Sequence, residues 1–441
     1  MKKHLLALSA AAVLLAPNAV GAEGFAVNEW SAEGLAMGGA RMFAENDAAN
    51  LAYNPAAMTK IQGEKIKATI AYIAPHGKWK ADTKENVDVP VTDASGAVVI
   101  NPTNQQPVTM PLPLGRGDGS WDASGRNRVN PAIAPGLFYV KQLNDKEWLG
   151  MGTYVRFGNL CQFERDSIVG SNAFSSRLNG CSIAMNYARK HDNKWSTSLG
   201  AEINYVGLQY DKNALNAMPV HLQGTSWALG WNAAANYEFD DKNEFAVVYR
   251  SKVKHSMEAE YDAHSALGPQ YGDAYGCITL PESWMLGYGH KFNDKTRMEL
   301  NATWTRWSRF DALNIGLSPA IESPLGPISG LNQAKNWKDG WRYAIGIEHK
   351  LSDKYTLLAG IAHDERGIPD ETADFMVPTG ERDTYSLGIQ YNDKKQTIAL
   401  GLGYMDVGDL NMSGHETDSY AKAKMHDSYT KIVVLSYQYN F

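Results

Sequence analysis

The side chains able to perform covalent or metal chemistry are few and scattered in this 441-residue sequence. It has three cysteines and eleven histidines, and no C-x-x-C pair or His/Cys cluster has the spacing of metal ligands. A serine hydrolase would need a serine and a histidine oriented by a third group, and no motif brings such residues together. We therefore expect no catalytic residues, no bound metal and no cofactor.

Carboxylates recur in short polar segments that contain Asp beside Lys or Asn. Calcium binding of the EF-hand type would need a twelve-residue loop, which these segments lack. Asn, Asp and Ser instead favour tight turns, because their side chains hydrogen-bond nearby backbone groups. The segments, which we interpret as six hairpin tips, are 144–146, 191–193, 240–242, 293–295, 352–354 and 392–394.

The segments between these turns alternate in polarity with a period of two. In 227–239, for example, large apolar side chains such as Trp227, Leu229 and Trp231 alternate with small or polar ones, which places one apolar face on a strand. Six hairpins give twelve strands, and strands near 66–75 and 428–441 raise the count to fourteen. Short turns at one end, longer loops at the other and an even strand count indicate a transmembrane β-barrel of the outer membrane.

The composition agrees with this interpretation and excludes several other classes. The mean hydropathy is negative, which is too low for a helical membrane protein. The 42 Lys and Arg residues are fewer than the 48 Asp and Glu residues, so nucleic acid is not an expected partner. Composition alone would also allow a soluble protein of several domains, and the turns decide against it.

The first 22 residues are typical of a secretory signal peptide. Lys2 and Lys3 precede a short apolar core from Leu5 to Ala16, and small residues follow at 20–22. Export makes a disulfide possible, and Cys161 with Cys181 could close one loop. The alternative is that these cysteines remain buried thiols, and an odd number of cysteines leaves at least one outside any such bridge.

Residues 23–64 lack a sustained period of two and differ from the strands that follow. Residues 31–50 are rich in Ala, Gly and Met, which suits short helices and close packing. Pro55 fixes its own φ and biases Asn54 away from helix, so Asn54, Pro55 and Ala56 predict a turn. The segment is either a periplasmic extension or a plug inside the barrel, and a plug explains better how so wide a barrel avoids leaking. We expect the barrel itself to span 65–441.

The last strand carries Val433, Leu435, Tyr437, Tyr439 and Phe441 on one face. An aromatic terminal residue after alternating apolar positions resembles the signal by which the barrel-assembly machinery recognises its clients. That machinery, outer-membrane lipid and lipopolysaccharide are therefore expected partners of a monomeric barrel in the outer membrane of a Gram-negative bacterium.

Several stretches together resemble the FadL family of long-chain fatty-acid transporters, which includes the toluene-type hydrocarbon channels. The matching stretches are 24–35, 54–56, 280–284, 304–308, 337–343, 370–375 and 385–388. The resemblance implies a fourteen-stranded barrel with an N-terminal hatch in its lumen. It also implies passive uptake of hydrophobic molecules, which pass a loop groove and a luminal pocket and leave sideways into the bilayer.

The resemblance also implies roles for individual residues, each with a structural alternative. Phe25 and Val27 match the tail that competes for the luminal pocket, or they simply pack the hatch. Gly158 stands where the family has a strand kink and lateral exit, or it is an ordinary strand-end glycine. Asn54, Pro55 and Ala56 match the hatch motif, or they only hold a turn.

The ligand itself suggests further candidates. A buried carboxylate needs a cation, and Lys335 and Lys338 before the tenth strand are candidates, unless they are solvated loop lysines. Leu215 and Met218, in the apolar segment 215–222, are candidates for the outer landing groove. The charged stretch 363–369 departs from the family pattern and leaves the substrate range open, with aromatic hydrocarbons as the alternative to fatty acids. A general porin is the less favoured function, because residues 23–64 would obstruct an open channel.

Overall fold

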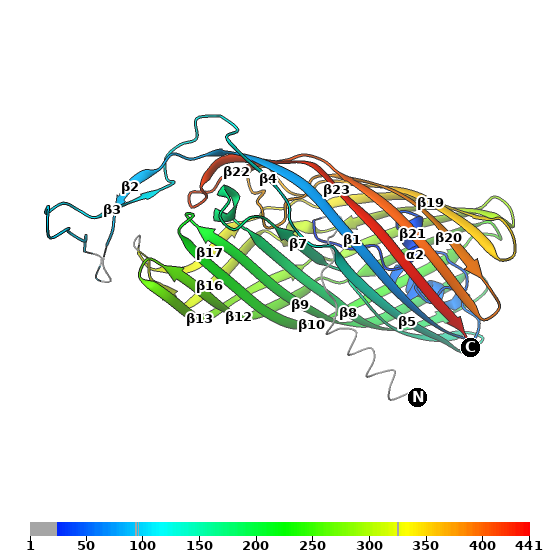
Figure 1. Cartoon of the computed structure of the whole chain (residues 1–441). Coiled ribbons are helices and arrows are strands. Elements are labelled where there is room, and N and C mark those ends of the chain that lie inside the picture. The colour runs from blue at the N-terminus through cyan, green and yellow to red at the C-terminus, as the bar shows by residue number, and fades with distance from the viewer. Residues whose placement is uncertain (1–23, 93–94, 96, 324–325) are drawn as a thin grey trace.

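A computed structural model describes residues 24–92, 95, 97–323 and 326–441 of the chain. Its main feature is one closed antiparallel β-barrel (Figure 1). The predicted signal peptide at residues 1–22 lies outside the described residues. Within the described ranges, no helix is both long enough and apolar enough to cross a membrane.

The barrel wall has fourteen strands, as predicted. Several of them consist of two pieces in line. In wall order they are β1 (Glu64–Thr83); β4 (Ala123–Arg126) with β5 (Ala132–Asn144); β6 (Glu147–Tyr154) with β7 (Gly158–Gln162); β8 (Ser175–Lys190); β9 (Trp195–Ala214); β10 (Met218–Glu238); β11 (Asn243–Arg250) with β12 (Val253–Ser265); β13 (Gly268–Leu280) with β14 (Ser283–Lys291); β15 (Thr296–Thr305) with β16 (Ala312–Ile321); β17 (Ile328–Ala334) with β18 (Gly340–Lys350); β19 (Tyr355–Asp364); β20 (Arg382–Asn392); β21 (Gln396–Val407) with β22 (Leu410–Ser413); and β23 (Tyr420–Asn440).

The barrel closes where its first strand meets its last. β1 pairs with β23 from Lys65↔Asn440 to Thr83↔Tyr420, and the other edge of β1 pairs with β5. Two further strands, β2 (Val87–Pro90) and β3 (Thr109–Leu112), form a small hairpin that stands away from the barrel (Figure 1). Because the first and last strands pair, the sheet has no terminal edge strand, as a bilayer requires.

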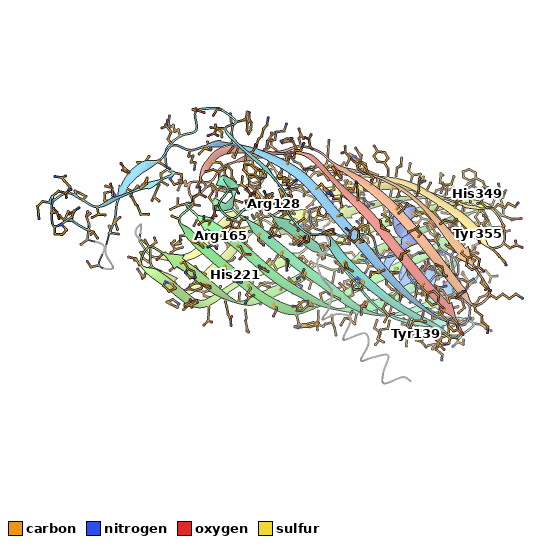
Figure 2. The ribbon with its side chains drawn as sticks, viewed as in Figure 1. Arg128, Tyr139, Arg165, His221, His349 and Tyr355 are labelled. Atoms are coloured by element: carbon orange, nitrogen blue, oxygen red, sulfur yellow. The ribbon has the colours of Figure 1, made fainter. Side chains whose placement is uncertain are left out.

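All six predicted polar turns connect neighbouring wall strands at one end of the barrel. The hydrogen bonds follow the predicted chemistry: at the β10–β11 turn, Asp240 Oδ1 accepts from the backbone N–H groups of Lys242 and Asn243, both at 2.8 Å. Tyr139, His349 and Tyr355 lie towards this end, whereas Arg128, Arg165 and His221 lie towards the other (Figure 2). The end with short turns faces the periplasm in barrels of this kind.

The alternation of side chains is also confirmed. Trp227, Leu229 and Trp231 on β10 are 54%, 78% and 48% exposed, whereas Asn232 and Asn236 of the same strand are buried. The outer face is therefore an apolar band, and the inner face carries the polar side chains. Exposed aromatic side chains lie towards both ends of this band, for example Trp195 and Tyr355 near the short turns and Trp284 and Tyr343 towards the other end, as the aromatic girdles of such barrels do.

The N-terminal residues before β1 fold into short helical turns, as their composition predicts. They are α2 (Ala32–Ala36), α3 (Asn50–Tyr53) and the 3₁₀ helix η1 (Pro55–Lys60). The Ser31 side chain accepts from Gly34 N at 3.0 Å and caps α2. These elements are almost wholly buried against inward-facing side chains of the barrel wall.

The suggested bridge between Cys161 and Cys181 is wrong, because the structure has free thiols at both residues. The register sets Cys161 on β7 opposite Ser176 on β8. Cys181 lies five residues further along β8, roughly 17 Å away at about 3.4 Å per residue. A disulfide requires Cα atoms within about 7 Å, so the buried-thiol alternative holds.

Candidate functional site

The third barrel strand is interrupted between Tyr154, where β6 ends, and Gly158, where β7 begins. Pairing between β5 and β6 stops at Leu137↔Thr153. Among the described residues, the next backbone contact across this boundary is Arg128 N to Gln162 O at 2.7 Å. Residues 132–136 of β5 therefore pair with β1 and have no ladder partner among the described residues on their other edge.

The start of the described chain occupies the edge of the third strand that β5 leaves open. Phe157 O accepts from Gly180 N of β8 at 3.0 Å. Because successive residues direct their backbone groups to opposite edges, Arg156 and Gly158 direct theirs away from β8. There, Val27 N donates to Arg156 O and Gly158 N donates to Phe25 O, both at 2.8 Å.

Gly158 thus lies at the interruption, where the kink was predicted. A second glycine on the neighbouring strand permits the close approach: a Cβ on Gly180 would lie 2.3 Å from Phe157 O. Side chains rarely tolerate such a distance to backbone, so Gly180 is a functional candidate that the sequence reasoning missed. Its signal would have been a glycine opposite the proposed kink.

Phe25 is 1% exposed and lies in a pocket of aromatic rings. Its ring centroid is 4.8 Å from that of Trp307, 5.7 Å from those of Phe310 and Trp337, and 6.0 Å from that of Phe157. These are edge-to-face or tilted arrangements at favourable separations. The two tryptophans come from stretches 304–308 and 337–343, which the sequence had singled out.

Val27 is also buried, but in a separate apolar cluster against β1, β21 and β23. Phe25 instead joins the largest apolar cluster, which fills the lumen towards the end opposite the short turns. We call this part the upper lumen. Met218, predicted to line an exposed landing groove, is a buried member of that cluster. Leu215 is half-buried at the β9–β10 turn with a φ of +55°. The segment 215–222 is therefore a hairpin end whose apolar side chains largely face inward.

The two candidate lysines differ sharply. Lys335 is 2% exposed, and its Nζ forms an ion pair with Asp374 and donates to Gln333 Oε1 at 3.2 Å. Lys338 is exposed, and its backbone N–H donates to Gly367 O. Lys335 therefore lies within the upper lumen and Lys338 on the outer rim.

A polar network surrounds Lys335 within the apolar cluster. Asn172 Nδ2 donates to Asp418 at 3.2 and 3.3 Å, and its Oδ1 accepts from Phe375 N at 3.0 Å. Lys212 is also buried and interacts electrostatically with the carboxylates of Asp418 and Asp374. Lys212 is thus a second luminal cation, and the sequence reasoning did not single it out.

Arg382 at the start of β20 contacts the N-terminal tail, residues 24–27, from another side. Its Nη2 donates to Gly24 O at 2.9 Å. A small cavity of about 50 Å³ lies here, lined by Gly24, Asn159, Cys161 and Arg382 among others. The cavity adjoins the open edge of the third strand, so displacement of the tail would enlarge it.

Ion pairs fasten the residues that follow the tail to the wall. Lys67 Nζ on β1 contacts Glu33 Oε1 and Asp47 Oδ1, both at 2.8 Å. Arg41 contacts Glu348 of β18 at 2.5 Å. Burial alone would raise the pKa of the Asp47 carboxyl, but Lys67 and Arg41 hold it below its usual range.

The turn motif anchors the same region. Asn54 Oδ1 accepts from Ala56 N at 3.1 Å, and its Nδ2 donates to Met42 O at 2.9 Å. Pro55 is the first residue of η1, a position that needs no N–H donor. The predicted turn at Asn54–Ala56 is therefore present.

A buried charge cluster lies in the lumen beside α3. Glu202 is fully buried and accepts from Arg156 Nη1 at 2.9 Å and from Arg250 Nη1 at 2.7 Å. Arg250 also donates to Ala52 O of α3. Glu202 lies on the polar face of 195–205, and a charge at an inward position was the signal for it.

The charged stretch 363–369 is satisfied internally. Asp364 pairs with Arg342 at 2.7 Å, Glu365 accepts from Trp341 N at 3.0 Å, and Arg366 pairs with Asp370. This stretch therefore presents no free charge row to the lumen. In the part of the chain that the structure describes, no three His, Cys, Asp or Glu residues are grouped to hold a metal.

A closed antiparallel barrel with short turns at one end, an apolar outer band, two aromatic girdles and a polar interior is a transmembrane β-barrel of the outer membrane. A family model described as outer membrane protein transport protein (OMPP1/FadL/TodX) matches residues 13–441. The chain belongs to this family, and it is an outer-membrane protein of a Gram-negative bacterium.

Two curated relatives match along almost their whole length. The chain is 24% identical to the long-chain fatty acid transport protein of Escherichia coli K12, with 95% of each chain covered. It is 26% identical to outer membrane protein P1 of Haemophilus influenzae Rd, with 92% of this chain and 90% of that one covered. The matched proteins that carry a functional name are transporters or channels rather than enzymes.

Solved structures support the same fold. A Pseudomonas aeruginosa FadL homologue gives a TM-score of 0.78 at 19% identity, with 95% of this chain and 100% of that chain covered. The Pseudomonas putida toluene transporter TodX gives a TM-score of 0.67 at 17% identity, with 94% and 99% covered.

Proposed function

We propose that this chain carries long-chain fatty acids or similar hydrophobic compounds across the outer membrane by passive diffusion. The observation that carries the proposal is the position of Phe25. This apolar tail residue fills an aromatic pocket of the lumen while its own backbone covers an open strand edge in the wall. One displacement would therefore vacate a hydrophobic binding site and uncover an exit beside it.

Residues 24–63 act as the hatch in this mechanism. The ion pairs of Lys67 and Arg41 hold α2 and the following turns, whereas residues 24–27 are held by backbone hydrogen bonds, apolar contacts and Arg382. The tail is thus the part of the hatch that a ligand displaces most easily. The rest stays in place and keeps the lumen closed to ions.

The exit is the open boundary between residues 132–136 of β5 and the third strand. An alkyl chain gains about 0.8 kcal/mol per buried CH₂, and it keeps this gain if it passes from an apolar pocket directly into lipid. Release into the periplasm would lose it. Diffusion down a gradient then suffices, and no cofactor is needed.

Lys335 and Lys212 supply the luminal positive charge for a carboxylate head group. Lys335 already pairs with Asp374, so a fatty acid would share or replace that partner. Lys338, on the outer rim, takes no part in this step. Aromatic hydrocarbons are the second candidate substrate, because Trp307, Trp337 and Phe310 could stack on a monoaromatic ring in place of Phe25.

Uptake of labelled oleate and of labelled toluene by a transporter-deficient host tests the proposal. We expect expression to raise uptake of oleate, and of toluene if the aromatic pocket sets the range. Unchanged uptake of both would refute the transport function. The purified protein in planar bilayers should conduct few ions, and large steady channels would refute the closed hatch.

The exit is tested separately with Gly158→Val. A β-branched residue favours regular strand pairing at this position, so uptake should slow while ligand binding persists. Gly340→Ala is a matched control, since a Cβ there lies at an ordinary 3.5 Å from Glu365 O. Wild-type uptake by Gly158→Val would place the exit elsewhere.

A further inference from the structure

A row of large aromatic side chains crosses the outer wall of the barrel on four neighbouring strands. The register sets Tyr249 of β11 opposite Trp284 of β14, Trp284 opposite Trp304 of β15, and Trp304 opposite Trp341 of β18. The ring centroids of Tyr249 and Trp284 are 4.7 Å apart. Trp231 of β10 extends the row, with its centroid 4.9 Å from that of Tyr249.

The depth of this row follows from its distance to the hairpin tips. On β14 the outward positions run from Trp284 to His290, and Phe292 lies at the tip beyond them. The nine residues from Trp284 to Phe292 span roughly 27 Å along the strand at about 3.4 Å per residue step. Nine residues is the lower end of the roughly 9–11 that a tilted strand needs to cross the hydrocarbon. The row therefore lies at the outer-leaflet border of the bilayer.

Two arginines are held side by side immediately above the row. Glu282 Oε1 contacts Arg306 Nη1 and Arg309 Nη2, both at 3.1 Å, and its side chain is 9% exposed. Arg306 N also donates to Glu282 O at 3.0 Å. The guanidinium side chains remain 43% and 33% exposed. One buried carboxylate thus positions two cations and neutralises one of them.

Two lysines lie on the same rim as these arginines, and we call the four basic residues together the cationic ledge. Lys252 follows β11, and Lys338 precedes β18, two residues beyond the last β15–β18 pair, Thr305↔Gly340. Both are exposed, and neither ammonium forms an ion pair with any described residue. The neighbouring carboxylate of Asp339 accepts from Ser308 N at 2.9 Å and interacts electrostatically with Arg309. The ledge consists of Lys252, Arg306, Arg309 and Lys338.

An apolar groove descends from the ledge along the lipid-facing wall. Its volume is about 570 Å³. The small side chains of Ala233 and Ala235 leave its floor open, Trp231 and Trp284 stand at its sides, and Glu282 with Arg306 closes its upper end. Its shape suits an acyl chain, and its upper end suits an anion on that chain.

We propose that this ledge and groove bind the lipid A part of lipopolysaccharide, with a phosphate on the ledge and an acyl chain in the groove. Arginine forks and free ammonium groups complement phosphate, and interfacial tryptophans anchor at head-group depth. The position decides the source of the phosphate. The ledge is at the end opposite the short turns, where the leaflet is built from lipopolysaccharide rather than phospholipid. This site is separate from the luminal pocket and does not depend on the transported substrate.

Native mass spectrometry of the purified full-length protein, titrated with bis-phosphorylated hexa-acyl lipid A, tests the site. We expect Arg306→Gln/Arg309→Gln to weaken binding at least tenfold. Lys252→Gln/Lys338→Gln should weaken it at least threefold, and these lysines make no ion pair whose loss would disturb folding. The control Arg126→Gln/Arg165→Gln removes two exposed charges at the same end without touching the groove, and it should bind within twofold of wild type.

Two other lipids identify what is recognised. Lipid A without phosphates and phosphatidylglycerol should both bind at least tenfold more weakly than bis-phosphorylated lipid A. Equal affinity for phosphatidylglycerol would overturn the assignment to lipopolysaccharide. Heat-modifiable gel migration shows whether the arginine variant is folded. If the lysine variant and the folded arginine variant both bind lipid A with wild-type affinity, the proposed site is wrong. If the arginine variant does not fold, the lysine variant alone decides.

Discussion

Replacing Phe25 with alanine is the most direct perturbation of the luminal pocket. The phenyl ring is 1% exposed and touches four other rings. Burial of such a side chain contributes about 1.5–3 kcal/mol, and aromatic pairing adds about 0.5–1.5 kcal/mol. The tail should therefore dock more weakly by about 2–4 kcal/mol, which is roughly 30- to 1000-fold in its docking equilibrium.

This change should appear as tighter ligand binding. If the tail and the ligand compete, the apparent Kd is the intrinsic Kd divided by the fraction of molecules with an empty pocket. We expect the apparent Kd for oleate to fall at least tenfold in Phe25→Ala, measured by displacement of a fluorescent fatty acid from the detergent-solubilised protein. Phe25→Leu, which keeps much of the apolar area, should lie between alanine and wild type.

Phe239→Ala is the matched control, because Phe239 is 51% exposed at a hairpin tip and far from the pocket. It should bind oleate like wild type. An unchanged Kd in Phe25→Ala would show that the tail does not occupy the ligand's place. Weaker binding would show that Phe25 contacts the ligand instead of competing with it.

Three further outcomes are expected from other parts of the molecule. Gly180→Ala drives a Cβ to 2.3 Å from Phe157 O, so it should cost about 1–3 kcal/mol in urea unfolding and alter uptake, and wild-type values of both would contradict the close approach. Glu202→Gln leaves two buried guanidiniums without their carboxylate and should lower the free energy of unfolding by about 3–5 kcal/mol; a loss below 1 kcal/mol in the same assay would contradict a tightly coupled cluster. Burial raises the pKa of Glu29 above its ordinary 4.5, with Arg342 opposing. The folded state therefore binds the Glu29 proton more tightly than the unfolded state does. The stability that this proton contributes is present below pH 4.5 and is lost as the pH rises through the raised pKa. Glu29→Gln should match wild type in acid and exceed it in stability near neutral pH, and equal stability at both pH values would refute the shift.

Local chemistry explains why the wall was predictable. Asp240 and its counterparts bond the backbone two and three residues ahead, so each tip is encoded within a few residues. The alternation around Trp227 and Leu229 requires nothing beyond the strand period of two. The number of wall strands, their order and the side chains that face outward could therefore be predicted without knowledge of any contact between distant segments.

Contacts between distant segments account for the misses. The bridge between Cys161 and Cys181 fails because of the β7–β8 register, which no local pattern reveals. Lys335 was predicted as a cation for the ligand, but its pairing with Asp374 depends on a loop 39 residues away. The open edge of β5 did leave one signal: Pro135 lacks an N–H, and proline is tolerated in strands where an edge is unpaired.

The contacts of the N-terminal segment with the closing seam have a consequence for how the molecule is made. Ala32 N donates to Ser436 Oγ at 2.8 Å, and Ala48 N donates to Gln438 Oε1 at 2.9 Å, while Lys67 holds the segment from the other side of the seam. The segment therefore binds both strands whose pairing closes the barrel. Those strands are the most distant in the chain, and their pairing carries the largest loop-closure entropy. A segment synthesised first and attached to both would act as an internal template, so the barrel would close around it during assembly.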